Sequence, residues 1–208
     1  MSKFNIIDIE HWERKEFYLH YINEVNCSYS VTVELDITPL KEQKLYPAMI
    51  YLLTNTVNEF EQFRMCIEED GLGVFETMNP SYTVFNAEHK NFSSIWTPYC
   101  SDYSEFLKQY QEDVEQYSKS IQFAPKKERP HNCFDISMIP WLTFTAFNIN
   151  VFSANKHLLP IFTMGKYYER DGKRVLPLSI QVHHSVCDGY HVAMFVKSLQ
   201  DKINNKII

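Results

Sequence analysis

The dipeptide Asp171-Gly172 is the feature that most constrains the fold of this chain. It lies between two runs rich in apolar, β-branched and aromatic residues, IFTMGKYYE at 161–169 and RVLPLSIQVHH at 174–184. Because Asp and Gly tolerate the positive φ angles of a tight two-residue turn, an Asp-Gly pair between such runs strongly indicates a β-hairpin. The sequence therefore predicts an antiparallel sheet with these strands near its centre.

Other segments show the same strand-like pattern. The segment 29–37, YSVTVELDI, alternates β-branched or aromatic positions with polar ones, as a half-buried strand does. Shorter runs separated by Asp-Gly, Asn-Pro and polar turns predict further strands at 63–69, 73–78, 81–88, 92–97, 134–141 and 143–152.

Helical spacing of apolar residues predicts four helices, at 12–23, 47–60, 101–120 and from 189 to the C-terminal end. Pro47 is expected as a first helical residue, and Ser101-Asp102 and Asp188 are expected as N-caps. The helices interrupt antiparallel strands without regular βαβ alternation. We therefore expect an α+β class: a two-layer sandwich in which helices cover a mixed, largely antiparallel sheet, in a single domain over residues 1–208.

The charge and cysteine content argue against several classes of partner and site. A formal charge of -6 with a pI near 5.7 repels phosphate backbones and anionic lipid, so neither nucleic acid nor membrane partners are expected. The five cysteines are scattered without a CxxC pair, which is typical of reduced thiols. No run approaches the roughly 20 apolar residues of a membrane span, and no secretion signal is visible. We expect a cytoplasmic protein.

The segment 183–191, HHSVCDGYH, concentrates three histidines, a cysteine and an aspartate. If a strand ends here, the side chains of His183 and His184 point to opposite faces and serve different roles. A metal site is disfavoured because strand, turn and helix intervene between the candidate ligands. Histidines with only a structural role remain an alternative. A neutral imidazole can also act as a general base near pH 7, and without a GxSxG motif we expect direct transfer between two substrates.

This segment resembles the HHxxxDG active-site signature of the chloramphenicol acetyltransferase family. The resemblance extends over almost the whole chain through HWERKEF, YPAMIYL, SYTVFNAE, SMIPWLTF, FNIN, IFTMGKYY and LPLSIQVHHSVCDG, in the family's order. It implies an enzyme that acetylates the 3-hydroxyl of chloramphenicol with acetyl-CoA and so confers antibiotic resistance. It also implies a homotrimer with active sites at subunit interfaces, and no metal.

The resemblance assigns roles to individual residues. His184 would be the general base, its Nδ1 bonded to its own carbonyl, and Asp188 would form a buried ion pair with Arg14. Thr163 would hold a water near the transition state, and Lys44, Lys166 and Tyr167 would approach CoA. The remaining residues of the implied antibiotic pocket are Tyr21, Val25, Cys27, Tyr29, Thr83, Phe92 and Leu158.

One position departs from the family pattern. Ala146 stands just before the Phe-Asn of FNIN, where the resemblance leads us to expect a serine that hydrogen-bonds the oxyanion. Thr145 would face the other way on a strand. A slow enzyme or a ligand-sequestering homologue is therefore one alternative. A dihydrolipoyl acyltransferase, which has a related His-x-x-x-Asp-Gly motif, is another, although this chain lacks that family's lipoyl domains and Ala/Pro-rich linkers.

Overall fold

A seven-stranded sheet forms one layer of the computed structural model, which describes residues 2–151 and 156–208. The strand order is β2-β10-β8-β7-β5-β6, with β9 paired to β10. Neighbouring strands are antiparallel except for the parallel pairs β5–β7 and β7–β8, so the mixed, largely antiparallel sheet is confirmed. The strands are β2 (Ser28–Asp36), β5 (Asn79–Asn86), β6 (Asn91–Trp96), β7 (Cys133–Met138), β8 (Ile161–Met164), β9 (Tyr168–Arg170) and β10 (Lys173–His183).

The predicted hairpin joins β9 to β10. Asp171 and Gly172 adopt φ angles of 52° and 74°, and Arg170 pairs directly with Lys173 across the turn. Strand β10 continues from this turn between β2 and β8, which makes it the most extensively paired strand of the sheet. Its even-numbered side chains Leu176, Leu178 and Ile180 are fully buried.

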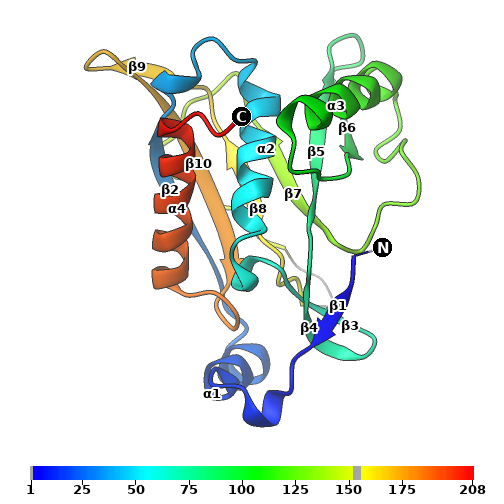
Figure 1. Cartoon of the computed structure of the whole chain (residues 1–208), viewed down its shortest axis with the longest axis vertical. Helices are drawn as coiled ribbons and strands as arrows, with labels where there is room; N and C mark the ends of the chain where they lie inside the picture. The colour runs from blue at the N-terminus through cyan, green and yellow to red at the C-terminus, as the bar shows by residue number, and fades with distance from the viewer. Residues whose placement is uncertain (1, 152–155) are drawn as a thin grey trace.

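Three helices cover one face of the sheet: α2 (Leu45–Val57), α3 (Tyr103–Tyr117) and α4 (Gly189–Asn204) (Figure 1). Asp102 and Asp188 occupy the expected N-cap positions of α3 and α4. The core lies between this layer and the sheet. None of the helices in the described part of the chain is long and apolar enough to cross a membrane.

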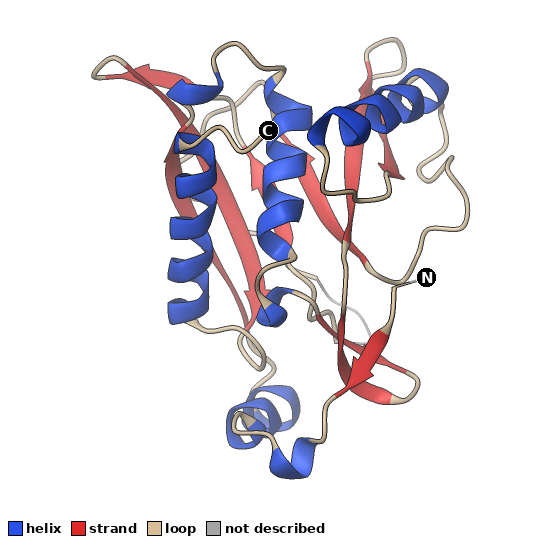
Figure 2. Cartoon of the chain, in the orientation of Figure 1, coloured by secondary structure: helices blue, strands red, loops and turns tan. Residues whose placement is uncertain are grey.

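A smaller sheet lies beside the main one, in the order β1 (Phe4–Ile6), β4 (Gly71–Phe75) and β3 (Met65–Glu68). The remaining helical pieces are short (Figure 2). They are α1 (Lys15–Leu19), a π-helical turn at His20–Glu24, and 3-10 turns at Ile9–His11, Thr38–Leu40 and Glu61–Phe63.

Three expectations need correction. The predicted helix 12–23 is divided: α1 begins at Lys15 and widens into the π-helical turn, a form that often accompanies functional residues. Pro47 is the third residue of α2, where its missing N–H still costs no helical bond. The predicted strand 143–152 forms no ladder over its described residues 143–151. Instead, the amide of Phe147 donates to Thr32 Oγ1 at 3.2 Å, and its carbonyl accepts from Ser179 Oγ at 2.7 Å.

Candidate active site

His184 lies one residue beyond the end of β10, in the turn that leads to α4. Its backbone N–H donates to the Cys27 carbonyl at 2.9 Å, which continues the pairing of β2 with β10. Its imidazole stacks on the Tyr21 ring, with centroids 4.2 Å apart and planes at 9°, and lies 5.1 Å from the Tyr29 ring. Nδ1 is buried, and the bond to its own carbonyl that the resemblance implies is not among the hydrogen bonds of the described residues. Aromatic packing therefore orients this ring.

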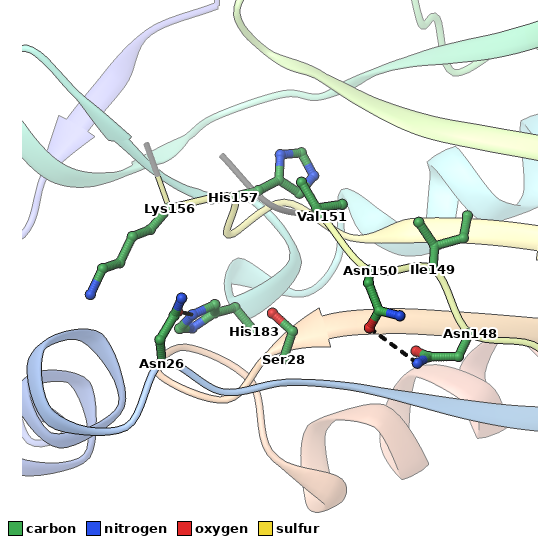
Figure 3. A pocket seen from close by; sticks show the side chains of 9 residues that line it. All are labelled: Asn26, Ser28, Asn148, Ile149, Asn150, Val151, Lys156, His157 and His183. Atoms are coloured by element: carbon green, nitrogen blue, oxygen red, sulfur yellow. Dashed lines mark hydrogen bonds between the residues drawn. The ribbon is translucent and has the colours of Figure 1, made fainter. Parts of the chain in front are cut away.

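His183, the last residue of β10, lines a small polar cavity of about 190 Å³ (Figure 3). Its Nδ1 accepts from the Ser185 amide at 3.2 Å, so Nε2 carries the proton and donates to Asn26 Oδ1 at 3.0 Å. Burial, together with the positive charge of Lys156, lowers the pKa of His183 to about 4. With both ring nitrogens engaged and the ring neutral, His183 has a structural role.

Arg14 and Asp188 form the ion pair that the resemblance implies. Arg14 Nη1 donates to Asp188 Oδ2 at 2.9 Å and so ties the segment before α1 to the N-cap of α4. Burial alone would raise the pKa of the Asp188 carboxyl, but the Arg14 hydrogen bond and the nearby His191 hold it below its usual range. The histidine within ion-pair distance of Asp188 is His191, with Nδ1 2.9 Å from Oδ1, and not His184. Asp188 is therefore no triad partner of His184 in this chain.

The pair is only partly satisfied. Arg14 Nε and Arg14 Nη2 are buried and have no hydrogen-bond partner in the described part of the chain. Buried polar atoms in native proteins are nearly always paired. This corner of the molecule therefore has hydrogen-bonding capacity for water or for groups from outside the chain.

A second candidate region is an apolar cavity of about 520 Å³. It lies beside β5, β6 and β7, which are at the opposite end of the strand order from β2 and β10. Aromatic and aliphatic side chains dominate its wall, as in sites for small aromatic ligands. Thr83 and Phe92, both predicted for the antibiotic pocket, line it. Tyr46 at the start of α2 donates to the Thr83 carbonyl at 2.9 Å. The other lining residues are Val84, Phe85, Tyr110, Ser137, Met138, Ile139, Pro140 and Trp141.

Ser137 provides a hydroxyl in the wall of this cavity, and the sequence patterns did not single it out. Its Oγ lies 3.0 Å from Oγ1 of Thr163, which is almost completely buried. Alternation along β7 was the available signal, because Ser137 follows the buried core residue Ile136 and so faces away from the helices. Ala146, by contrast, is exposed and lines a separate shallow groove beside β2.

Strand pairing shows that one chain keeps His184 apart from the cavity. Thr163 pairs with Ser179, which lies five residues before His184 on β10. At about 3.3 Å per residue, this separates Thr163 from His184 by roughly 17 Å along the strand. Thr83 lies three strands across from β10, a further displacement of roughly 14 Å at right angles. The predicted site residues therefore form two groups.

None of the three residues expected near CoA lines the cavity, although Lys44 and Lys166 are close to residues beside it. Lys44 is exposed and precedes α2 by one residue, so it is close in sequence to the cavity residue Tyr46. Lys166 follows β8, and its amide donates to the Leu142 carbonyl at 2.7 Å. The Tyr167 ring lies 5.6 Å from the guanidinium of Arg174.

Two predicted pocket residues contact neither region closely. Leu158 is buried in the core and is not part of the cavity wall. Val25 is exposed at the end of the π-helical turn that carries Tyr21. Over residues 2–151 and 156–208, no three His, Cys, Asp or Glu side chains gather as metal ligands.

Comparison with known proteins identifies the family. The family model of chloramphenicol acetyltransferase matches residues 2–200. The chain belongs to the chloramphenicol acetyltransferase family. A relative of this name from Campylobacter coli is 49% identical over 97% of this chain and 99% of its own length. Another, from Clostridium perfringens, is 47% identical over 98% of this chain and 96% of its own length. The predicted membership and the predicted enzyme class are therefore confirmed.

Solved structures place the fold. A structure named chloramphenicol acetyltransferase superposes with a TM-score of 0.89 at 24% identity, covering 97% of this chain and all of that one. The dihydrolipoamide acetyltransferase of Azotobacter vinelandii superposes with a TM-score of 0.69 at 18% identity, covering 92% of this chain and 87% of that one. The fold is thus shared between proteins named as acetyltransferases for different acceptors, so the fold alone does not specify the acceptor.

Proposed function

We propose that this chain transfers the acetyl group of acetyl-CoA to the 3-hydroxyl of chloramphenicol, with His184 as general base, and thereby confers resistance to the antibiotic. The observation that carries the proposal is the His184 imidazole. Its ring is fixed by Tyr21 and Tyr29, and no hydrogen bond to another described residue occupies a ring nitrogen. Family membership supplies the acceptor and the acetyl group.

The reaction proceeds without a covalent enzyme intermediate. Nε2 of His184 accepts the proton of the 3-hydroxyl while the hydroxyl oxygen forms a bond to the thioester carbonyl carbon of acetyl-CoA. The resulting tetrahedral oxyanion collapses by breaking the carbon–sulfur bond. The imidazolium returns its proton to the CoA thiolate, and 3-acetylchloramphenicol and CoA leave.

Ser137 is proposed as the hydrogen-bond donor to the oxyanion. Thr163 Oγ1 lies at hydrogen-bond distance from Ser137 Oγ, and both hydroxyls lie on the sheet face that bounds the apolar cavity. A donor positioned before the reaction stabilises developing charge without reorganisation. Ser137 thus compensates for the lack of a hydroxyl at Ala146.

We propose further that the catalytic unit is a homotrimer in which His184 of one copy faces the cavity of the next. The separation between His184 and Thr163 within one chain, and the unpaired Nε and Nη2 of Arg14, support this arrangement. Lys44, Lys166 and Tyr167 would then hold CoA at the cavity end, with the lysines pairing with its phosphates. Tyr21, Cys27 and Tyr29 would contact the acceptor from the His184 side.

The test is an assay of CoA release with acetyl-CoA and chloramphenicol. The wild type is expected to turn over, and His184→Ala is expected to lose roughly 10²–10⁴ in kcat, the range for a general base. His89→Ala removes an exposed histidine in the β5–β6 turn and is expected to leave kcat unchanged. Undiminished turnover in His184→Ala would remove His184 from the mechanism.

The fold shared with dihydrolipoamide acetyltransferase motivates one competing acceptor. Dihydrolipoamide is therefore assayed in parallel. Acetyl transfer to the dithiol alone would refute chloramphenicol as the acceptor. Binding of chloramphenicol without CoA release would identify a sequestering protein.

A further inference from the structure

Behind the aromatic wall of the apolar cavity lies a buried chain of polar contacts that the proposed mechanism does not use. Lys126 Nζ lies 2.5 Å from Asp113 Oδ1, and Thr97 Oγ1 donates to Asp113 Oδ2 at 2.7 Å. Since the single hydroxyl proton of Thr97 is committed to Asp113, Tyr82 must donate to Thr97 across the 2.7 Å between their oxygens. The Lys126 and Asp113 side chains are only 17% and 12% exposed.

The hydrogen bonds from Tyr82 through Thr97 to Asp113 support two tyrosines of the cavity. Tyr82 is 1% exposed, and its ring packs edge-on against Tyr46, with centroids 6.4 Å apart, and against Tyr110 at 5.2 Å. Tyr46 and Tyr110 both line the cavity, from α2 and α3 respectively. The hydrogen bond from Tyr82 to Thr97 therefore fixes a ring on which both cavity tyrosines rest.

On the other side of Asp113, Lys126 holds the segment 120–126 against the sheet. The Lys126 ammonium lies 4.4 Å from the Trp96 ring centroid, a cation–π contact with the last residue of β6. Ahead of Lys126, the Phe123 carbonyl accepts from the Ser94 amide at 2.6 Å, and the Gln122 carbonyl accepts from Ser93 Oγ at 2.7 Å. Strand β6 is the last strand of the sheet, so this segment occupies its open edge.

The segment 120–126 also contributes Phe123, whose ring contacts the cavity residue Phe92. The rings of Phe123 and Phe92 meet at 6.0 Å and 76°, and Phe92 lines the cavity. Both side chains are more than half exposed, so core packing does not restrain them. Their mutual position depends on the backbone of 120–126, which is anchored at one end by Lys126.

We propose that the Lys126–Asp113 ion pair is a positioning element that sets the shape of the apolar cavity and so its affinity for the aromatic acceptor. The inference rests on the proposed function, since chloramphenicol is the acceptor used to measure it. A largely buried ion pair adds little net stability over well-packed apolar residues, but it demands one geometry. An ion pair at this place is therefore better explained by geometric control of the cavity than by stability.

The test separates positioning from stability. Lys126→Met and Asp113→Asn each leave a partner without its counter-charge and are expected to lower the melting temperature. The double variant Lys126→Met/Asp113→Leu removes both charges and is expected to regain it. All three are expected to raise KM for chloramphenicol about 10-fold, while kcat and KM for acetyl-CoA stay within about 2-fold.

A control breaks an ion pair outside the cavity wall in which the lysine is buried and the carboxylate is half-exposed. Lys202 on α4 is 6% exposed and lies 2.6 Å from Glu59. Lys202→Met is expected to lower the melting temperature without changing KM for chloramphenicol. If the double variant recovers both melting temperature and KM, the pair is merely structural and the proposal is overturned.

Hydrogen exchange provides a readout that needs no substrate. Exchange of the Ser94 amide, which bonds to the Phe123 carbonyl, is expected to accelerate in Lys126→Met and in the double variant but not in Lys202→Met. A wild type without turnover would refute the proposed function, and the positioning claim would then be decided by this exchange. Unchanged exchange in Lys126→Met would refute the claim.

Discussion

The corner around His184 and the cavity around Ser137 are complementary in what they contain. The corner offers an imidazole, two aromatic rings and several buried polar atoms without partners. The cavity offers apolar volume and the Ser137 hydroxyl. Among the described residues that line it, the titratable groups are Tyr46 and Tyr110, whose pKa values burial raises, that of Tyr110 to about 12. Neither region alone holds both a base for an alcohol and a donor for an oxyanion, and this difference is the basis of the proposal that they are two halves of one site.

A second comparison concerns the two adjacent histidines. His183 and His184 are adjacent in the sequence, yet their rings differ in hydrogen bonding: both ring nitrogens of His183 are engaged, whereas the His184 ring stacks on Tyr21 and its Nδ1 has no partner among the described residues. The ring with both nitrogens engaged cannot take a proton from a substrate. The neighbouring ring is the one proposed as the base.

The largest effect that would sharpen the comparison of the two halves is expected at Ser137. Ser137→Ala removes the proposed oxyanion donor and is expected to lower kcat by roughly 10²–10³, with KM for chloramphenicol little changed. Ala146→Ser is the matched control and is expected to change kcat by less than about 2-fold, because position 146 lies outside the cavity. Steady-state kinetics decide the matter. The reverse ranking would assign the donor to position 146.

A smaller effect would sharpen the comparison of the histidines. His183 has a pKa of about 4 in the fold, whereas an unfolded histidine titrates near 6.5. Between these values the unfolded state binds more protons, so the free energy of unfolding falls as pH drops from about 6.5 to about 4, by up to roughly 3 kcal/mol. His183→Gln, measured by denaturant titration at several pH values, is expected to flatten this dependence. His184→Ala is expected to retain it, and an unchanged slope in His183→Gln would contradict the burial argument.

Local sequence patterns predicted the secondary-structure elements better than they predicted how those elements pack together. The Asp171-Gly172 turn and most of the period-two runs depend on nearby residues, and they predicted the hairpin and most of the strands, although the run 161–169 is divided into β8 and β9. The segment 143–151 shows the limit. Alternation indicates a face that is buried, but a strand also needs a partner edge, and the sequence does not say which edge is available.

The candidate site likewise contains residues that local motifs identified and one whose position depends on tertiary contacts. His184, Asp188 and Arg14 were identified from motifs, and the ion pair of the last two is present. Ser137, the proposed oxyanion donor, was not predicted because its position in the cavity wall depends on β7 lying beside β8 and on a cavity that α2 and α3 also line. Such contacts join residues far apart in the sequence. The expectation built on FNIN concerned position 146, and Ala146 lies outside this cavity.

The most direct test of a site shared between copies is complementation in mixed oligomers. His184→Ala and Ser137→Ala chains, each nearly inactive alone, are unfolded together in equal amounts and refolded. If each site takes its imidazole from one copy and its hydroxyl from the next, about a quarter of the sites regain both groups, and roughly 25% of wild-type activity returns. Activity no greater than the sum of the two variants refolded separately would show that each chain carries a complete site, contrary to this account.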